Sequence, residues 1–167
     1  MNPERALDAE PLSLADIPMK PLPRTDNALL VRTHFGNDDA WMALRGSIED
    51  STTGDGFRAY VDFLSDPQYD GADAKALVKL SPSDSSFFLV ADDATFADPQ
   101  RPILVVNLFG DPSLDDDPYF AKRGDAFRSI VSVLWSVENN LSLGNMGFEE
   151  FVAAVDADGV FRGFPEA

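Results

Sequence analysis

A single histidine, His34, is the residue on which acid–base chemistry would have to be built. Cysteine is absent, which excludes thiolate nucleophiles, zinc–thiolate sites, iron–sulfur clusters and disulfides. His34 follows the apolar run 28–33, at the expected carboxyl end of a strand, where ligand crevices of α/β sheets form. We take His34 as a candidate site residue, with simple packing at the strand end as the alternative. No residue is assigned a catalytic role, and an enzyme is the less favoured interpretation.

Carboxylates follow several of the expected strands, and Asp92 and Asp93 come directly after the apolar run 87–91. Oxygens gathered at the ends of parallel strands could hold Mg²⁺. The pattern loosely resembles response-regulator receiver domains, but no lysine follows the fifth strand as it would in that family. Aspartate also favours loops and caps, because it hydrogen-bonds nearby backbone. We therefore expect structural roles for Asp92 and Asp93, and no metal site is assigned.

Arginine also occurs in unusual places, within short expected strands. A guanidinium on a sheet face pairs with a carboxylate or binds an anionic ligand through two hydrogen bonds. In so acidic a protein, internal ion pairs are the favoured explanation. Ligand binding stays open for Arg128 and Arg162. The arginines concerned are Arg32, Arg58, Arg128 and Arg162.

Motifs for common cofactors are missing. The turn after the first expected strand holds one glycine, Gly36, whereas dinucleotide binding needs a glycine-rich turn. No G-x-x-x-x-G-K-[ST] loop or G-x-S-x-G elbow occurs. The stretch 156–159 resembles the start of a calcium loop, but its glycine comes two positions early and the final glutamate is missing. We predict a tight turn there, and we expect no cofactor.

The charge balance indicates the kind of partner. The 167 residues include 29 acidic and 13 basic ones, giving a net charge of −16. Such a field repels phosphate backbones and anionic lipid, so nucleic acid and membranes are excluded as partners. It favours encounter with a basic protein; the alternative is that the acidity only keeps the protein soluble. With no secretory signal and no apolar run that could span a bilayer, the cytoplasm is expected.

The elements that must position these residues alternate between strand and helix. Two of the strands are apolar throughout, which indicates a sheet covered on both faces. We predict a single three-layer α/β domain with a largely parallel or mixed sheet of about five to six strands and about four helices. Strands are expected at 28–33, 57–63, 87–91, 103–109, 127–131 and 160–164, with helices beginning near 38, 72, 132 and 145.

Helix starts are predicted from side chains that can accept a first-turn N–H. Asn37 or Asp38 is the expected N-cap of the first helix, Ser132 of the third and Asn145 of the last. The segment 1–25 contains five of the 12 prolines and is predicted to be an extended arm, with residues 26–167 forming the domain. The sequence does not decide whether this arm packs on its own domain or on another chain, nor the oligomeric state.

Three stretches in the C-terminal third carry a family resemblance: 134–142, 145–151 and 158–164. They resemble a family of small uncharacterised bacterial proteins, found mainly in high-GC Gram-positive species and known only as a domain of unknown function. Shorter pieces between residues 22 and 61 fit the same pattern, so the resemblance covers about 22–164. It implies a bacterial, intracellular setting and brings no activity with it.

Within the first stretch, Asn139 and Asn140 are poor residues for a helix interior. One of them could end the helix in a left-handed conformation, and the other could contact a ligand or partner. Glu138 and Trp135 lie beside them, and they complete the candidate binding residues, although Trp135 could simply belong to the core.

The favoured function is a protein-interaction module, such as an immunity-type or regulatory protein that binds a basic partner through its acidic surface. The first alternative is a small-ligand-binding protein or enzyme with a strand-end pocket for an anionic ligand. The second is a degenerate receiver-like module that binds Mg²⁺.

Overall fold

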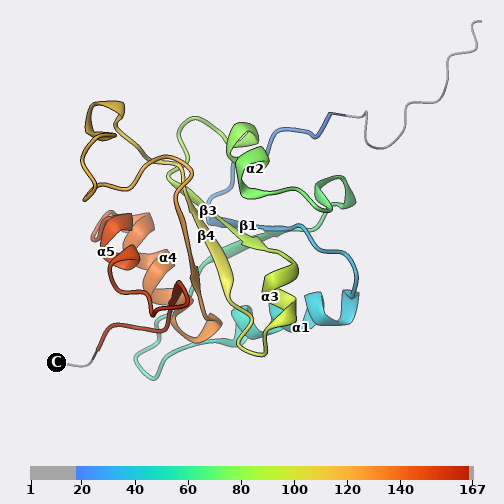
Figure 1. Ribbon diagram of the computed structural model, residues 1–167. Helices are drawn as coiled ribbons and strands as arrows, with labels where there is room; N and C mark the ends of the chain where they lie inside the picture. Colours follow the sequence, from blue (N-terminus) through green and yellow to red (C-terminus); the bar gives the residue numbers. More distant parts are fainter. Residues whose placement is uncertain (1–17, 166–167) are drawn as a thin grey trace, which may run out of the picture.

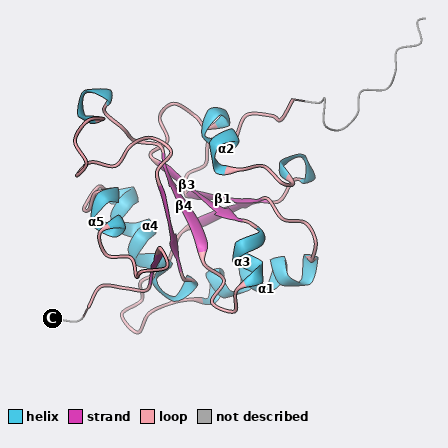
Figure 2. Ribbon diagram, viewed as in Figure 1, coloured by secondary structure: helices cyan, strands magenta, loops and turns pink. Residues whose placement is uncertain are grey.

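The computed structural model describes residues 18–165, which form one six-stranded mixed sheet with helices on both faces (Figures 1 and 2). The predicted three-layer α/β class is confirmed. The strands are β1 (Ala28–Arg32), β2 (Val61–Leu64), β3 (Phe87–Ala91), β4 (Ile103–Asn107), β5 (Ala126–Ser129) and β6 (Val160–Phe161). The helices are α1 (Asp38–Asp50), α2 (Ala74–Leu80), α3 (Asp93–Ala97), α4 (Leu134–Leu143) and α5 (Phe148–Val152).

The strand order is β2-β1-β3-β4-β5-β6. β1 is parallel to both β2 and β3, β4 is antiparallel to β3 and β5, and β6 is parallel to β5. Five strands therefore share one direction and β4 alone is reversed. One end of the sheet carries the carboxyl ends of β1, β3 and β5, and the opposite end carries their amino ends together with the carboxyl end of β4.

Each face of the sheet has its own apolar layer. The first face packs against α1, α4 and α5, with Leu30, Leu89 and Phe127 among its buried residues. The second face packs against α2 through residues such as Val31 and Val90. In Figure 1, α2 accordingly lies across the strands from α4 and α5. All five residues of β3 are buried, as predicted for a strand covered on both sides.

The described part of the predicted arm, residues 18–25, lies against its own domain. Leu22 is buried, and its N–H donates to the Leu80 carbonyl at 2.8 Å. The Tyr69 hydroxyl donates to the Lys20 carbonyl at 2.7 Å, which fixes the chain two residues before Leu22. The remainder of the predicted arm, residues 1–17, lies outside the described residues.

One of the three predicted helix caps is confirmed. Asn37 caps α1, because its Oδ1 accepts from the Ala40 N–H at 3.0 Å. The other two predicted caps are wrong. A 3₁₀ turn, Val131–Val133, precedes α4, so Ser132 lies inside that turn and no side chain caps the helix. α5 begins at Phe148, after Gly147, whose N–H donates to Glu150 Oε2 at 2.8 Å.

Candidate functional site

The strand-end residues Arg128 and Asp92 bind each other. Arg128 Nη1 lies 2.9 Å from Asp92 Oδ1, and Nη2 lies 2.7 Å from Oδ2, so the pair is bidentate. Asp92 Oδ1 also accepts from the Thr95 N–H at 3.1 Å and caps α3, a helix that the sequence analysis did not predict. Burial alone raises the pKa of Asp92, but the Arg128 and Thr95 hydrogen bonds outweigh it and hold that pKa below its ordinary value.

Replacing Asp92 by asparagine is expected to lower the free energy of unfolding by about 1–2 kcal/mol at neutral pH, because Arg128 loses its charge partner. Since the pKa of Asp92 is lower in the folded state than in the unfolded state, the ion pair's stabilisation is complete above about pH 4 and is lost as the pH falls further. The difference between wild type and D92N in urea unfolding should therefore shrink from pH 7 to pH 3. A constant difference would contradict this assignment.

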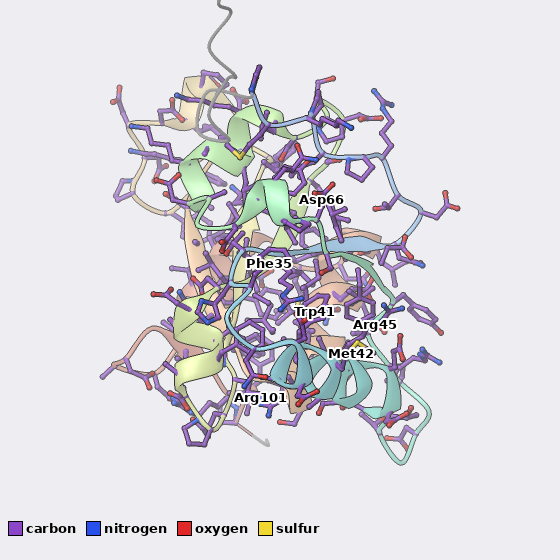
Figure 3. The ribbon with its side chains drawn as sticks, turned by 90° about the vertical axis from the view of Figure 1, so that its right-hand side faces the viewer. Phe35, Trp41, Met42, Arg45, Asp66 and Arg101 are labelled. Atoms are coloured by element: carbon purple, nitrogen blue, oxygen red, sulfur yellow. The ribbon has the colours of Figure 1, made fainter. Side chains whose placement is uncertain are left out.

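The other strand arginines are also engaged internally, as the sequence analysis favoured. Arg32 Nη2 lies 2.7 Å from Asp38 Oδ1, and its guanidinium lies over the Phe35 ring at 4.2 Å. Figure 3 labels Phe35 and Trp41 on the side of the molecule that carries α1. Arg162 contacts Asp156 and Asp158 at 2.8 and 2.7 Å. Two arginines differ from their predicted places, because Arg58 lies before β2 and Arg162 follows β6. Among the described residues, no carboxylate forms an ion pair with Arg58.

His34 lies beside the Phe96 ring, with 5.7 Å between the ring centroids. It lines a hollow of about 370 Å³ together with Asp92 and Asp93, at the carboxyl ends of β1 and β3. Within residues 18–165, no group of three or more histidine, aspartate or glutamate side chains is arranged to hold a metal ion. The hollow therefore gathers acids around one histidine without forming a metal site in the described chain.

Glu138, Asn139 and Trp135 come together on α4, but they face the segment before β2 rather than a pocket. The buried Glu138 carboxylate accepts from the Tyr60 N–H at 3.1 Å, the Asn139 amide at 2.6 Å and the Ser142 hydroxyl at 2.9 Å. Asn139 also donates to the Arg58 carbonyl at 2.9 Å. Trp135 stacks on Phe57, with the ring centroids 5.2 Å apart. These contacts hold residues 57–60 against α4, which explains why the predicted strand 57–63 begins only at Val61.

Asn140 has a local role at the end of the same helix. Its amide donates to the Ser136 carbonyl at 2.8 Å, and its carbonyl accepts from the Asn145 N–H at 3.0 Å. The expectation that an asparagine ends the helix in a left-handed conformation is wrong, since Gly144 does so with φ +70°. The sequence candidates thus fall into separate clusters: Arg128 with Asp92, Arg162 with Asp156 and Asp158, His34 with Phe96, and the α4 group.

A groove that the sequence analysis missed lies at the opposite end of the sheet. It has a volume of about 440 Å³ and lies between the β4–β5 loop and the connection from α4 to α5. Its lining is mainly apolar. We use the name "loop groove" for this hollow, which is lined by Ser86, Phe87, Asn107, Phe109, Gly110, Asp111, Leu114, Phe120, Ala121, Leu141, Gly144, Asn145, Met146, Gly147, Phe148 and Glu149.

The buried Asn107 holds both ends of the β4–β5 loop, residues 108–125. Its side-chain amide donates to the carbonyls of Phe109 and Lys122, and its Oδ1 accepts from the Phe109 N–H at 3.2 Å. Its backbone accepts from the Gly124 N–H at 2.7 Å and donates to the Asp125 carbonyl at 2.8 Å. The wall of the loop groove is therefore anchored at its base. The one sequence signal for this was the polar Asn107 inside an apolar run.

Comparison with known proteins gives the family. The model of a domain of unknown function, DUF6924, matches residues 27–164. The chain belongs to this family. No curated protein matches the chain.

The DUF6924 match begins one residue before β1 and ends after β6, so it covers the whole sheet and every residue that lines the loop groove. The segment 18–25 lies outside the match, although it packs against α2 of the DUF6924 domain. Within the described residues, no helix of the DUF6924 domain has both the length and the apolar character needed to cross a membrane.

Proposed function

We propose that this DUF6924 protein is a protein-interaction module that binds a basic partner protein through the loop groove, in an immunity-type or regulatory role. The observation that carries the proposal is the distribution of charge around the groove. The lining residues come from three stretches, 80–100, 102–121 and 129–161, and none of these stretches contains a lysine or an arginine. The β4–β5 loop, residues 108–125, carries five aspartates, Asp111, Asp115, Asp116, Asp117 and Asp125, against the two basic residues Lys122 and Arg123.

Apolar side chains accompany this charge. Phe109, Leu114 and Phe120, which line the apolar hollow, are 73 %, 37 % and 36 % exposed. Exposed apolar groups gathered beside a hollow are typical of a surface that another molecule covers. The acidic rim would steer a basic protein toward this surface, and the apolar groups would hold it once bound.

The alternatives have less support. An anionic ligand at the strand ends would have to displace Asp92 from Arg128, or Asp156 and Asp158 from Arg162. A receiver-like module would need a carboxylate cluster for Mg²⁺ at the hollow near His34. We further propose a bacterial, cytoplasmic setting, with neither nucleic acid nor a membrane as partner, because the net charge of −16 repels both.

The test is purification of the tagged protein from its native host at 50 and 500 mM salt. We expect a basic protein to co-purify at low salt and to leave at high salt. The variant D115N/D116N/D117N should weaken its binding about tenfold, because three rim charges each contribute a few tenths of a kcal/mol or more.

The matched control is D26N/D55N/D70N, which changes the net charge equally at exposed positions outside the loop groove. We expect this control to bind the partner nearly as well as wild type. A partner retained at 500 mM salt, or weakened equally by both triple variants, would contradict the proposal, as would the absence of any basic partner.

A further inference from the structure

We infer that the loop groove binds a short amphipathic segment of the partner, in which one large apolar side chain is inserted between flanking lysine or arginine residues. This inference rests on the proposed function and adds the chemistry of the bound segment. It is carried by the floor of the groove, the fixed geometry of its wall and the charges on its rim.

The floor of the loop groove is apolar and buried. Phe87 and Phe148 are 9 % and 5 % exposed, and the partly buried Leu141 and Met146 complete the floor. On the loop side, Leu114 and Phe120 remain 37 % and 36 % exposed. A hollow of about 440 Å³ lies within the range of sites that enclose small ligands, so it can take a large side chain with its adjoining backbone.

Several hydrogen bonds fix the loop wall in place. Beyond the Asn107 hydrogen bonds, the Arg123 guanidinium donates to the carbonyls of Leu108 at 2.8 Å and Val78 at 3.3 Å. A Cβ at Gly110 would lie 3.0 Å from the Arg123 backbone nitrogen, so glycine permits a close approach of the two ends of the loop. A wall fixed in this way loses little freedom on binding, which favours a defined occupant.

Acidic groups line both sides of the groove, Asp111 from the loop and Glu149 from the first turn of α5. Further acids follow these lining residues in sequence: Asp115–Asp117 after Leu114, and Glu150 after Glu149. Hydrogen bonds from the side chain and backbone of Ser113 hold the pKa of Asp111 below its ordinary value, so this acid stays ionised. Arg123, the nearest arginine in sequence, uses its guanidinium on backbone carbonyls. Cations on either side of an inserted apolar group would therefore face carboxylates.

The same charges disfavour occupants from this chain. A second copy brings its own net charge of −16. Residues 1–17 contain four acids and one arginine, so their net negative charge would be repelled by the acidic rim. A cationic segment of a different protein is the occupant that this charge pattern fits.

The experiment uses the full chain and three fluorescein-labelled peptides in fluorescence anisotropy titrations at 50 mM salt. The first peptide has a central phenylalanine with two lysines on each side, the second replaces the phenylalanine with alanine, and the third replaces the lysines with serines. We expect the first peptide to bind at least tenfold more tightly than either of the others, because only it supplies both the anchor and the charges.

Two groove variants, F120S and M146S, should each remove most of the preference for phenylalanine. The matched control M42S changes an apolar residue on α1 (Figure 3) that is 58 % exposed and is not among the groove's lining residues, and it should leave the preference intact. Chemical-shift changes at the amides of Gly110, Gly144 and Gly147 would locate the bound peptide independently of any variant.

Equal affinity for the phenylalanine and alanine peptides would overturn the inference, and so would failure of all three to bind at 1 mM. Neither result decides the proposed function, which fails only if the salt-dependent basic partner is missing or is indifferent to the loop aspartates. The two failures are therefore distinguishable.

Discussion

Replacing Asn107 by aspartate is expected to lower the free energy of unfolding by about 3 kcal/mol at pH 7. The substitution keeps the shape of the side chain but replaces its NH₂ group with a carboxylate oxygen. That oxygen would face the carbonyls of Phe109 and Lys122, which now accept from the Asn107 amide. Two hydrogen bonds would be lost, and a buried charge would meet two acceptors. Urea unfolding, followed by circular dichroism, measures the effect.

The size of the N107D effect should depend on pH. A carboxyl group buried among carbonyl oxygens is favoured in its neutral form, so the destabilisation should decrease as the pH falls toward 4. N107L, which loses the hydrogen bonds without adding charge, should cost about 2 kcal/mol at every pH. Hydrogen exchange at the Gly124 amide should accelerate in both variants, because its acceptor is the Asn107 carbonyl.

N145A is the matched control for stability. Asn145 is exposed, so its replacement should change the free energy of unfolding by less than about 0.5 kcal/mol. If N107D unfolded like N145A, the β4–β5 loop would not be anchored by Asn107, and the fixed wall of the loop groove would lose its basis.

The layers of this fold could be predicted because they depend on patterns local to each strand. The runs 87–91 and 103–106 are apolar on both faces, and such runs are stable only where both faces are covered. The stripe of Trp41, Leu44 and Ile48 likewise places α1 on one face of the sheet. The reversal of β4 left no comparable signal, since an apolar strand has the same pattern in either direction.

The contacts around the candidate residues could not be predicted in the same way. Arg128 and Asp92 are 36 residues apart, and Glu138 and Tyr60 are 78 residues apart, so only the tertiary fold brings each pair together. The sequence favoured ion pairs for the strand arginines, and Arg32, Arg128 and Arg162 form them, but it did not show with which carboxylates. The loop groove was missed for the same reason. One of its walls, the β4–β5 loop, comes before β5 in the chain, and the other, the α4–α5 connection, comes after β5.

Ser132 and Asn145 show why local rules failed at the helix starts. Each has a side chain that could cap a helix, but the preceding element already fixes the chain around each. Ser132 lies in a 3₁₀ turn that follows directly from β5, and the Asn145 N–H is already engaged by the end of α4. Capping preference decides a boundary only where the neighbouring chain is free to adopt it.

Glu138 offers the second large effect. Replacing Glu138 by alanine is expected to lower the free energy of unfolding by about 3 kcal/mol. The buried carboxylate accepts from Tyr60, Asn139 and Ser142, and no lysine or arginine pairs with it among the described residues. Its removal leaves the Tyr60 N–H without this acceptor and opens a void beneath the segment 57–60.

The comparison with Glu49→Ala separates this role from a general loss of acidic charge. Glu49 is half exposed on α1 and pairs only with Arg45 one turn away, so E49A should change stability by less than about 0.5 kcal/mol. In E138A, the fluorescence of Trp135 should also change, because its stacking partner Phe57 belongs to the segment that Glu138 holds. Equal stability of E138A and E49A would mean that the Asn139 and Trp135 contacts alone fix this segment, and that the buried carboxylate adds no stability to the fold.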